Sequence, residues 1–254
     1  MLRELVAAIV ILCLAMTVSA GAAQRGGTPD AEQRYRACMD QVGSDAGQAS
    51  RTAEDWRRQG GGHAARHCAA AADLALGRFA EAGEALEALA RDGSRDSPIL
   101  RASLFGQAAH AWLAADMPDR AEAAATKALE LAPRDATLLV LKARALAGQH
   151  RFGEAIADLD QAIAVDPEFA DAYVFRASAL RQDQALDSAA ADLDEALSLA
   201  PTHPEALLER GIVRRLKGDG AGARADWQAL LAADPTTPAA ESARLNLERM
   251  DKGQ

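Results

Sequence analysis

The sequence predicts an all-α protein in which antiparallel helix pairs stack one after another. Four prolines stand at equal intervals of 34 residues, namely Pro133, Pro167, Pro201 and Pro235. A period of this length is typical of a helical hairpin copied along a chain. The composition agrees, because 49% of the residues are hydrophobic and only 4% are aromatic. Alanine, the best helix former, supplies much of this hydrophobic fraction.

Small residues recur at fixed distances before the prolines. Twelve residues before them stand Ala121, Ala155, Ala189 and Ala223, and twenty-four residues before them stand Ala109, Ala143, Ala177 and Gly211. Two antiparallel helices approach closely only where the side chains between them are small, and larger side chains fill the grooves alongside. Each proline ends its hairpin, since proline cannot continue a helix and disfavours helical geometry in the residue before it.

The unit from Ala136 to Pro167 carries a leucine, alanine, phenylalanine and proline pattern that resembles the tetratricopeptide repeat family. The positions that match are Leu139, Ala143, Leu146, Phe152, Ala155, Leu159, Ala162 and Pro167. The resemblance is strong over Ala102–Pro235 and weaker upstream, where "GRFAEAGEAL" lacks a closing proline. It implies a right-handed superhelical solenoid of about five to six hairpins with a C-terminal capping helix.

The repeat pattern predicts one elongated domain with the following divisions. They are a signal peptide or uncleaved anchor (1–23), an atypical helical hairpin (30–62), a degenerate repeat (63–101), four repeats (102–135, 136–169, 170–203 and 204–237), and a capping helix with a tail (238–254). In the connection before the first regular repeat, Ser97 and Pro98 are typical of an N-cap and a first helical residue. We therefore expect that helix to start early.

The N-terminus has the order of a secretory signal. Arg3 precedes an apolar run from Leu5 to Val18, and small residues follow it, which predicts cleavage after Ala20 or Ala23. The alternative is an uncleaved membrane anchor, because the uncharged stretch from Leu5 to Ala23 has 19 residues. Arginine outnumbers lysine 24 to 4, which together with the alanine richness favours a bacterial, periplasmic protein.

Two cysteines, Cys38 and Cys68, remain after signal removal, and an even number in an exported chain favours a disulfide. Their separation of 30 residues is close to one repeat, so they would lie on neighbouring first helices. The alternative is a pair of buried thiols.

Charge and motifs exclude several classes of function. The net charge is −9 with no basic block, which argues against nucleic acid as a partner. His63 and His67 could share a metal beside Cys68, but one helical turn supplies too few ligands, so we expect polar helix surface there. Asp158 and Asp160 cannot meet on one helix and are predicted to be solvated charges. The sequence thus predicts no enzyme activity, no metal and no cofactor.

In each predicted hairpin the first of the two helices carries arginines, whereas the second helix is acidic. In the resembled family, first helices line a concave groove that holds peptides. By that resemblance the groove residues are His110, Val140, Arg144, Val174, Ser178, Arg181, Leu208, Ile212 and Arg215. Our hypothesis is an apolar groove whose arginines pair with carboxylates of an acidic or C-terminal peptide. The alternative is that these arginines balance neighbouring acids, and the family's lysine and asparagine clamp for a C-terminal carboxylate is not matched here.

One position departs from the repeat. Arg214 stands where the preceding units have Trp112, Leu146 and Leu180. Either the last hairpin shifts its register, or Arg214 lays its stem over the core and reaches an acid. Trp227, where earlier units have leucine, would then fill the space.

Three functions are compatible with these features. The first is an exported, non-catalytic interaction module that binds a protein or peptide partner. The alternatives are a membrane-anchored assembly factor of a cell-envelope complex, which would keep the N-terminal segment in the membrane, and an accessory domain of an envelope enzyme.

Overall fold

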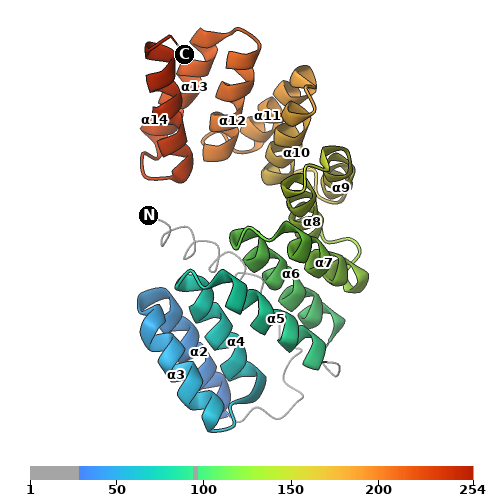
Figure 1. Ribbon diagram of the computed structural model, residues 1–254, viewed down its shortest axis with the longest axis vertical. Coiled ribbons are helices and arrows are strands. Elements are labelled where there is room, and N and C mark those ends of the chain that lie inside the picture. Colours follow the sequence, from blue (N-terminus) through green and yellow to red (C-terminus); the bar gives the residue numbers. More distant parts are fainter. Residues whose placement is uncertain (1–28, 94–96, 254) are drawn as a thin grey trace. The chain divides into compact units, whose positions relative to one another are not determined.

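The computed structural model describes residues 29–93 and 97–253, which form helices and no strands (Figure 1). The predicted signal segment lies outside the described residues. The helices are α2 (Pro29–Ser44), α3 (Ala46–Arg58), α4 (Gly62–Ala75), α5 (Phe79–Asp92), α6 (Pro98–Ala114), α7 (Pro118–Leu131), α8 (Ala136–Gly148), α9 (Phe152–Val165), α10 (Ala170–Gln182), α11 (Leu186–Leu199), α12 (Pro204–Leu216), α13 (Gly220–Ala233) and α14 (Pro238–Asp251). The predicted all-α fold of stacked hairpins is confirmed.

The helices belong to two compact units, and the boundary between them lies between Ala132 and Pro133. In the first unit the hairpins are α2 with α3, α4 with α5, and α6 with α7. In the second unit they are α8 with α9, α10 with α11, and α12 with α13, and α14 packs on the last pair. Helix α14 thus takes the predicted place of a cap. No helix within residues 29–93 or 97–253 combines the length and apolar character needed to cross a bilayer.

Local signals set the helix ends. Ser97 caps α6 by accepting a hydrogen bond from the Leu100 N–H, with Pro98 in the first turn, so this helix starts early as predicted. Helices α6, α8, α10 and α12 are each followed by a residue with positive φ, at Asp116, His150, Gln184 and Gly218, again 34 residues apart. In each case the following N–H donates back to the carbonyl five residues earlier, for example Arg151 to Leu146. This C-terminal motif turns the chain into the second helix.

Alanine and glycine allow the helices to pack closely. The alanines predicted at the interfaces are buried, and Gly83 and Gly211 have tryptophan rings against their Cα atoms. A Cβ on Gly83 would lie 2.6 Å from the Trp112 ring, and one on Gly211 would lie 2.2 Å from Trp227 Nε1. The indole N–H groups are paired, because Trp112 donates to Glu87 Oε1 and Trp227 donates to the Leu208 carbonyl.

Arg214 follows the second of the two predicted alternatives. Its Nη1 lies 2.8 Å from Asp226 Oδ2, while α12 keeps its helical register. Trp227 on α13 is buried and packs against Gly211, about one turn before Arg214 on α12, which supports the predicted compensation. The last hairpin of the second unit therefore accommodates a charge at a position where its predecessors carry leucine.

A repeated ion pair joins the helices of the second unit. Lys142, Arg176 and Arg210 on first helices contact Asp158, Asp192 and Asp226 on the second helices of the same hairpins, with N···O distances of 2.9, 2.6 and 2.8 Å. Arg176 and Arg210 also reach Asp160 and Asp194 of the preceding hairpins. The hydrogen bonds to Asp192 and Asp160 raise the pKa of Arg176 above its ordinary value. These pairs link each hairpin to its neighbour.

The prediction that Asp158 is a solvated charge is wrong. Asp158, Asp192 and Asp226 are buried, with 7%, 7% and 3% of their surface exposed. A carboxylate in this position is tolerable because a cation on the facing helix compensates the lost hydration. Asp160 does lie on the surface, yet it pairs with Arg176.

Candidate functional site

The predicted groove residues do not form one continuous surface. Val140 and Val174 are 4% and 3% exposed, so the prediction that they line an open groove is wrong. Val174 belongs to the hydrophobic core of the second unit, together with Ala177 and Leu207. At these positions the first helices face one another closely enough to enclose a β-branched side chain.

Arg181 is engaged within the protein. Its guanidinium binds the Glu209 carboxylate of the next first helix through two hydrogen bonds of 2.8 and 3.2 Å, and both side chains are largely buried. For Arg181 the alternative interpretation, that arginines balance neighbouring acids, therefore holds. Leu208 and Ile212 are half-buried against the core, Arg215 is exposed, and the half-buried His110 belongs to the first unit.

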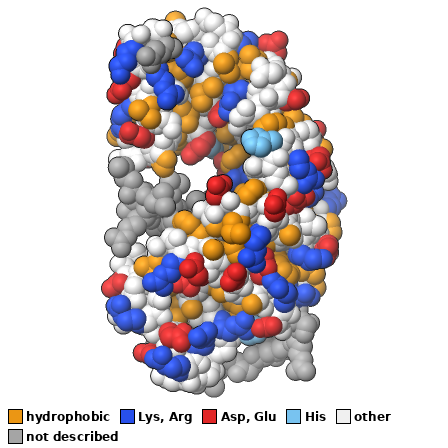
Figure 2. Space-filling view, in the orientation of Figure 1, with side chains coloured by type: hydrophobic (Ala, Val, Ile, Leu, Met, Phe, Trp, Pro, Cys, Tyr) orange, Lys and Arg blue, Asp and Glu red, His pale blue; other side chains and the backbone are white. Residues whose placement is uncertain are grey.

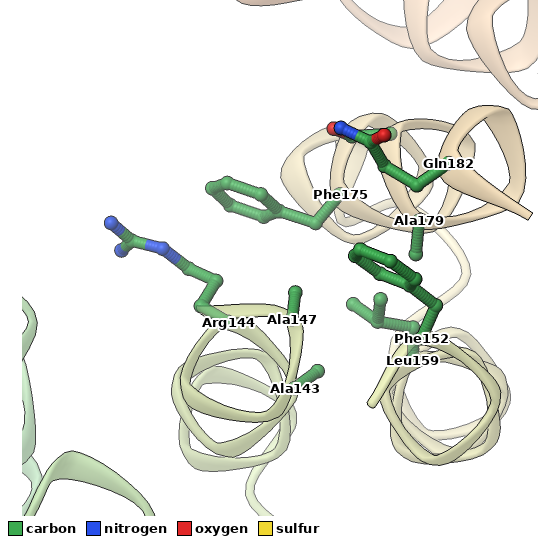
Figure 3. Close-up of a pocket in the computed structure, with 9 residues that line it drawn as sticks. Ala143, Arg144, Ala147, Phe152, Leu159, Phe175, Ala179 and Gln182 are labelled. Atoms are coloured by element: carbon green, nitrogen blue, oxygen red, sulfur yellow. The ribbon is translucent and has the colours of Figure 1, made fainter. Parts of the chain in front are cut away.

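Arg144 and Ser178, two of the predicted residues, meet in a cleft of about 220 Å³ in the second unit. Arg144, Ala143 and Ala147 come from α8, Phe152 and Leu159 from α9, and Phe175, Ser178, Ala179 and Gln182 from α10. Figure 3 shows the aromatic rings of Phe152 and Phe175 between the helices and Arg144 extending beyond them. The walls are thus mostly apolar, with polar groups at a few places.

Arg144 is the charged group of this cleft. Its guanidinium carbon lies 4.9 Å from the centre of the Phe175 ring, in a cation–π contact. Burial lowers the pKa of Arg144, and attraction to Asp171 partly opposes this effect. An arginine nevertheless stays protonated near neutral pH. The cleft therefore carries one partly desolvated positive charge.

Sequence reasoning missed Phe152, Phe175 and Gln182 as cleft residues. The signal was present on α10, where Phe175, Ser178 and Gln182 are separated by three and four residues and so share one helix face. Phe152 occupies a position that the repeat pattern prescribes, so the sequence alone indicates only a packing role for it.

A hydrogen-bonded row crosses the first helices of the first unit. The Tyr35 hydroxyl lies 2.8 Å from His67 Nδ1, and His67 Nε2 lies 3.0 Å from Gln107 Oε1. Because an amide oxygen only accepts, the proton of His67 lies on Nε2 and the tyrosine donates to Nδ1. Burial lowers the pKa of His67. The expectation of polar helix surface at His67 is therefore wrong, since the ring joins three helices.

Cys38 and Cys68 lie beside this row on α2 and α4. Their Cα atoms are 6.2 Å apart, within the range that a disulfide spans. Both residues are buried. Among the described residues, no group of three or more histidine, cysteine or acidic side chains is placed to hold a metal ion.

His203 links α10 and α12, two first helices of the second unit. Its Nε2 lies 2.8 Å from Asp171 Oδ1 on α10, and its Nδ1 accepts a hydrogen bond from the Ala206 N–H at the start of α12. The hydrogen bond to Asp171 raises the pKa of His203, and Glu205 at 3.4 Å adds to this effect, although burial opposes it.

We expect this histidine to make stability depend on pH. Because the pKa of His203 is higher in the folded chain than in the unfolded chain, protonation stabilises the fold. This stabilisation is complete below pH 6.5, the ordinary pKa of histidine, and is lost as the pH rises through the pKa of the folded state. Urea unfolding should therefore show the natural protein losing more stability than His203→Gln as the pH rises from mildly acidic to mildly alkaline, a comparison in which the contribution of His67 is the same on both sides. An unchanged slope in the variant would assign the dependence to other groups.

Comparisons with known proteins agree with the geometry. Residues 140–204 and 186–238 match the model of the tetratricopeptide repeat. This part of the chain therefore consists of tetratricopeptide repeats. No curated protein sequence matches the chain.

Solved structures show the same fold. The structure of PilW, a type IV pilus biogenesis factor, matches with a TM-score of 0.69 at 20% identity. The match covers 85% of this chain and 99% of the PilW chain. The protein TTC0263 from Thermus thermophilus has a TM-score of 0.61 at 19% identity, and the match covers 72% of this chain and 96% of the TTC0263 chain. YrrB, a tetratricopeptide repeat protein with an unusual peptide-binding site, has a TM-score of 0.50 at 16% identity, and the match covers 75% of this chain and 96% of the YrrB chain. At these identities the likeness establishes architecture alone.

Proposed function

We propose that the protein is an exported, non-catalytic adaptor that holds a protein or peptide partner on its first helices. The observation that carries this proposal is the cleft between α8, α9 and α10, where an arginine and two other polar side chains surround an apolar surface. Clefts of this composition bind other molecules, because the apolar walls supply affinity and the few polar groups orient the ligand. The peptide-binding site of YrrB, on a similar fold, supports the same class of function.

The surface charge fits a protein partner better than a nucleic acid. Basic and acidic side chains are interspersed on the face shown in Figure 2, and the net charge is −9. A nucleic-acid-binding protein instead gathers lysine and arginine on one face.

Site-specific photo-crosslinking in the native host tests the adaptor role. A photoreactive residue at Ser178 should form adducts with a partner, whereas the same residue at Gln161, exposed on α9, should not. Adducts from Gln161 alone would place the partner on the second helices and contradict the proposal.

A second candidate is an envelope assembly factor that remains anchored through Leu5–Ala23. The likeness to PilW over 85% of the chain favours it. The mass of the protein isolated from cells distinguishes the candidates, because a secreted adaptor lacks the signal and an anchored factor retains it.

We further propose export to the periplasm with Cys38 and Cys68 oxidised. The bond would close a loop of about 30 residues, for which chain entropy predicts roughly 3 to 4 kcal/mol of stabilisation. Changing both cysteines to alanine should therefore lower the unfolding free energy of the first unit by about this amount, measured by urea unfolding. The same loss should follow addition of a reductant to the natural protein. Two free thiols in the protein isolated from cells would contradict the oxidised state.

A further inference from the structure

We propose that the cleft of α8, α9 and α10 binds an extended peptide segment in which a glutamate or aspartate side chain stands next to a bulky apolar residue. This inference rests on the proposed adaptor function and names the ligand of the same cleft. Three features of the cleft support it, and they concern charge, volume and backbone hydrogen bonding.

Charge singles out Arg144 among the first-helix cations of the second unit. Carboxylates lie within 4.0 Å of Lys142, Arg176, Arg181, Arg210 and Arg214. Arg144 has no such partner among the residues that the structure describes, and Asp171 attracts it only from farther away. Its stacking on Phe175 leaves the edge of the guanidinium plane for a carboxylate, which can accept two parallel hydrogen bonds.

Burial makes this pairing favourable. The pKa of Arg144 is lowered because the guanidinium is partly removed from water. The folded protein therefore loses part of the hydration free energy of this charge and forms no ion pair that compensates the loss. A ligand carboxylate would offset that cost, and its attraction is stronger here than at an exposed arginine. A carboxylate on a side-chain stem can reach such a recessed group.

The volume of the cleft suits one large apolar side chain. It measures about 220 Å³ and its walls are the rings of Phe152 and Phe175 with Leu159 and three alanines. An apolar cavity of roughly 150 Å³ accommodates benzene, so a leucine or phenylalanine side chain fits this space. In Figure 3 Arg144 extends past the Phe175 ring, on the side away from Phe152 and Leu159, so the charge lies at the edge of the apolar space.

Ser178 and Gln182 suit the backbone of a chain that passes through the cleft. Neither side chain has a hydrogen-bond partner among the described residues, and each can both donate and accept. From Ser178 to Gln182 the helix rises about 6 Å, which equals roughly two residues of extended peptide. A row of this length can pair with N–H and C=O groups on both sides of the anchored residue. This favours an internal segment over a chain end.

Binding of defined peptides to the full chain tests the inference. The first probe is an acetylated and amidated peptide of about six residues with Glu-Leu-Phe at its centre, and the second has Gln-Leu-Phe instead. A third ends in Ala-Leu-Phe with a free carboxylate. Isothermal titration should show the glutamate peptide binding at least about tenfold more tightly than the other two, as expected for a charge-assisted hydrogen bond.

Protein variants assign the effect to the cleft. Arg144→Gln should weaken the glutamate peptide by about tenfold and leave the glutamine peptide unchanged. Arg249→Gln, which removes an exposed arginine on α14, should change neither. Arg144→Lys keeps the charge but loses the planar fork, and should give an intermediate loss. Far-UV circular dichroism verifies that each variant is folded.

Several outcomes would overturn the inference. Equal affinity of the glutamate peptide for the natural protein and for Arg144→Gln would remove Arg144 from the site. Tightest binding of the peptide with the free carboxylate would assign the cleft to chain ends. Equal binding of all three peptides would show that the cleft does not require an acidic side chain, which rejects the inference and leaves the adaptor function intact. Absence of any binding would reject this ligand, while crosslinking at Ser178 would still decide the adaptor function independently.

Discussion

Replacing Gly211 by alanine is expected to destabilise the second unit by about 1 to 3 kcal/mol, although alanine is the residue found at this position in the preceding repeats. The added Cβ would lie 2.2 Å from Trp227 Nε1 and 2.7 Å from two ring carbons. Trp227 is fully buried, so its ring cannot move aside without disturbing the core. Urea unfolding followed by far-UV circular dichroism measures the loss.

A second change should reverse part of this loss. The equivalent pairs in the earlier hairpins of this unit are Ala143 with Leu159 and Ala177 with Leu193. Trp227→Leu alone should also destabilise, because it leaves a cavity above Gly211. Together, Gly211→Ala and Trp227→Leu recreate the earlier pairs, so the double variant should lose less than the sum of the two single losses.

Gly153→Ala is the matched control, since no atom lies within 4 Å of its added Cβ. It should be neutral or stabilising by up to about 1 kcal/mol, as expected for alanine in a helix. If Gly211→Ala behaved like this control, or if the two losses simply added, the packing described for Trp227 would be incorrect.

The sequence predicted the architecture well because each repeat is defined locally. A proline, a few small residues and a capping residue such as Ser97 are enough to start, space and end a helix, and a stack needs only contacts between neighbours. The cysteines illustrate the same advantage, since Cys38 and Cys68 meet because equivalent positions on neighbouring first helices lie side by side.

The candidate site was predicted less completely, because burial depends on side chains from several helices. Val140 and Val174 were assigned to a groove by resemblance to the family, and the packing of this particular chain encloses them. Asp158 was judged from its own helix alone, where it does look like surface charge. Its partner Lys142 lies on the facing helix, and only the recurrence of both residues at intervals of 34 could have revealed the pair.

Replacing Asp226 by alanine is expected to lower the unfolding free energy by about 3 kcal/mol, the lower end of the range for breaking a buried ion pair. The carboxylate accepts hydrogen bonds from Arg210 Nε and Nη2 at 3.1 and 2.8 Å and from Arg214 Nη1 at 2.8 Å. Without it, Arg210 and Arg214, one turn apart on α12, lose the carboxylate on α13 that both of them contact. Because their side chains are 21% and 32% exposed, water can reach them and limits the loss.

Asp194→Ala provides the control, because Asp194 contacts the same Arg210 at 2.9 Å while its side chain is 65% exposed. A surface pair of this kind contributes at most about 1 kcal/mol, so this variant should unfold almost like the natural protein. Adding Arg214→Leu to Asp226→Ala should recover part of the loss, since leucine occupies this place in the two preceding repeats and no unpaired charge remains there. Equal losses for Asp226→Ala and Asp194→Ala would show that burial does not strengthen the pair. In that case the buried ion pairs would not stabilise the hairpins of this unit.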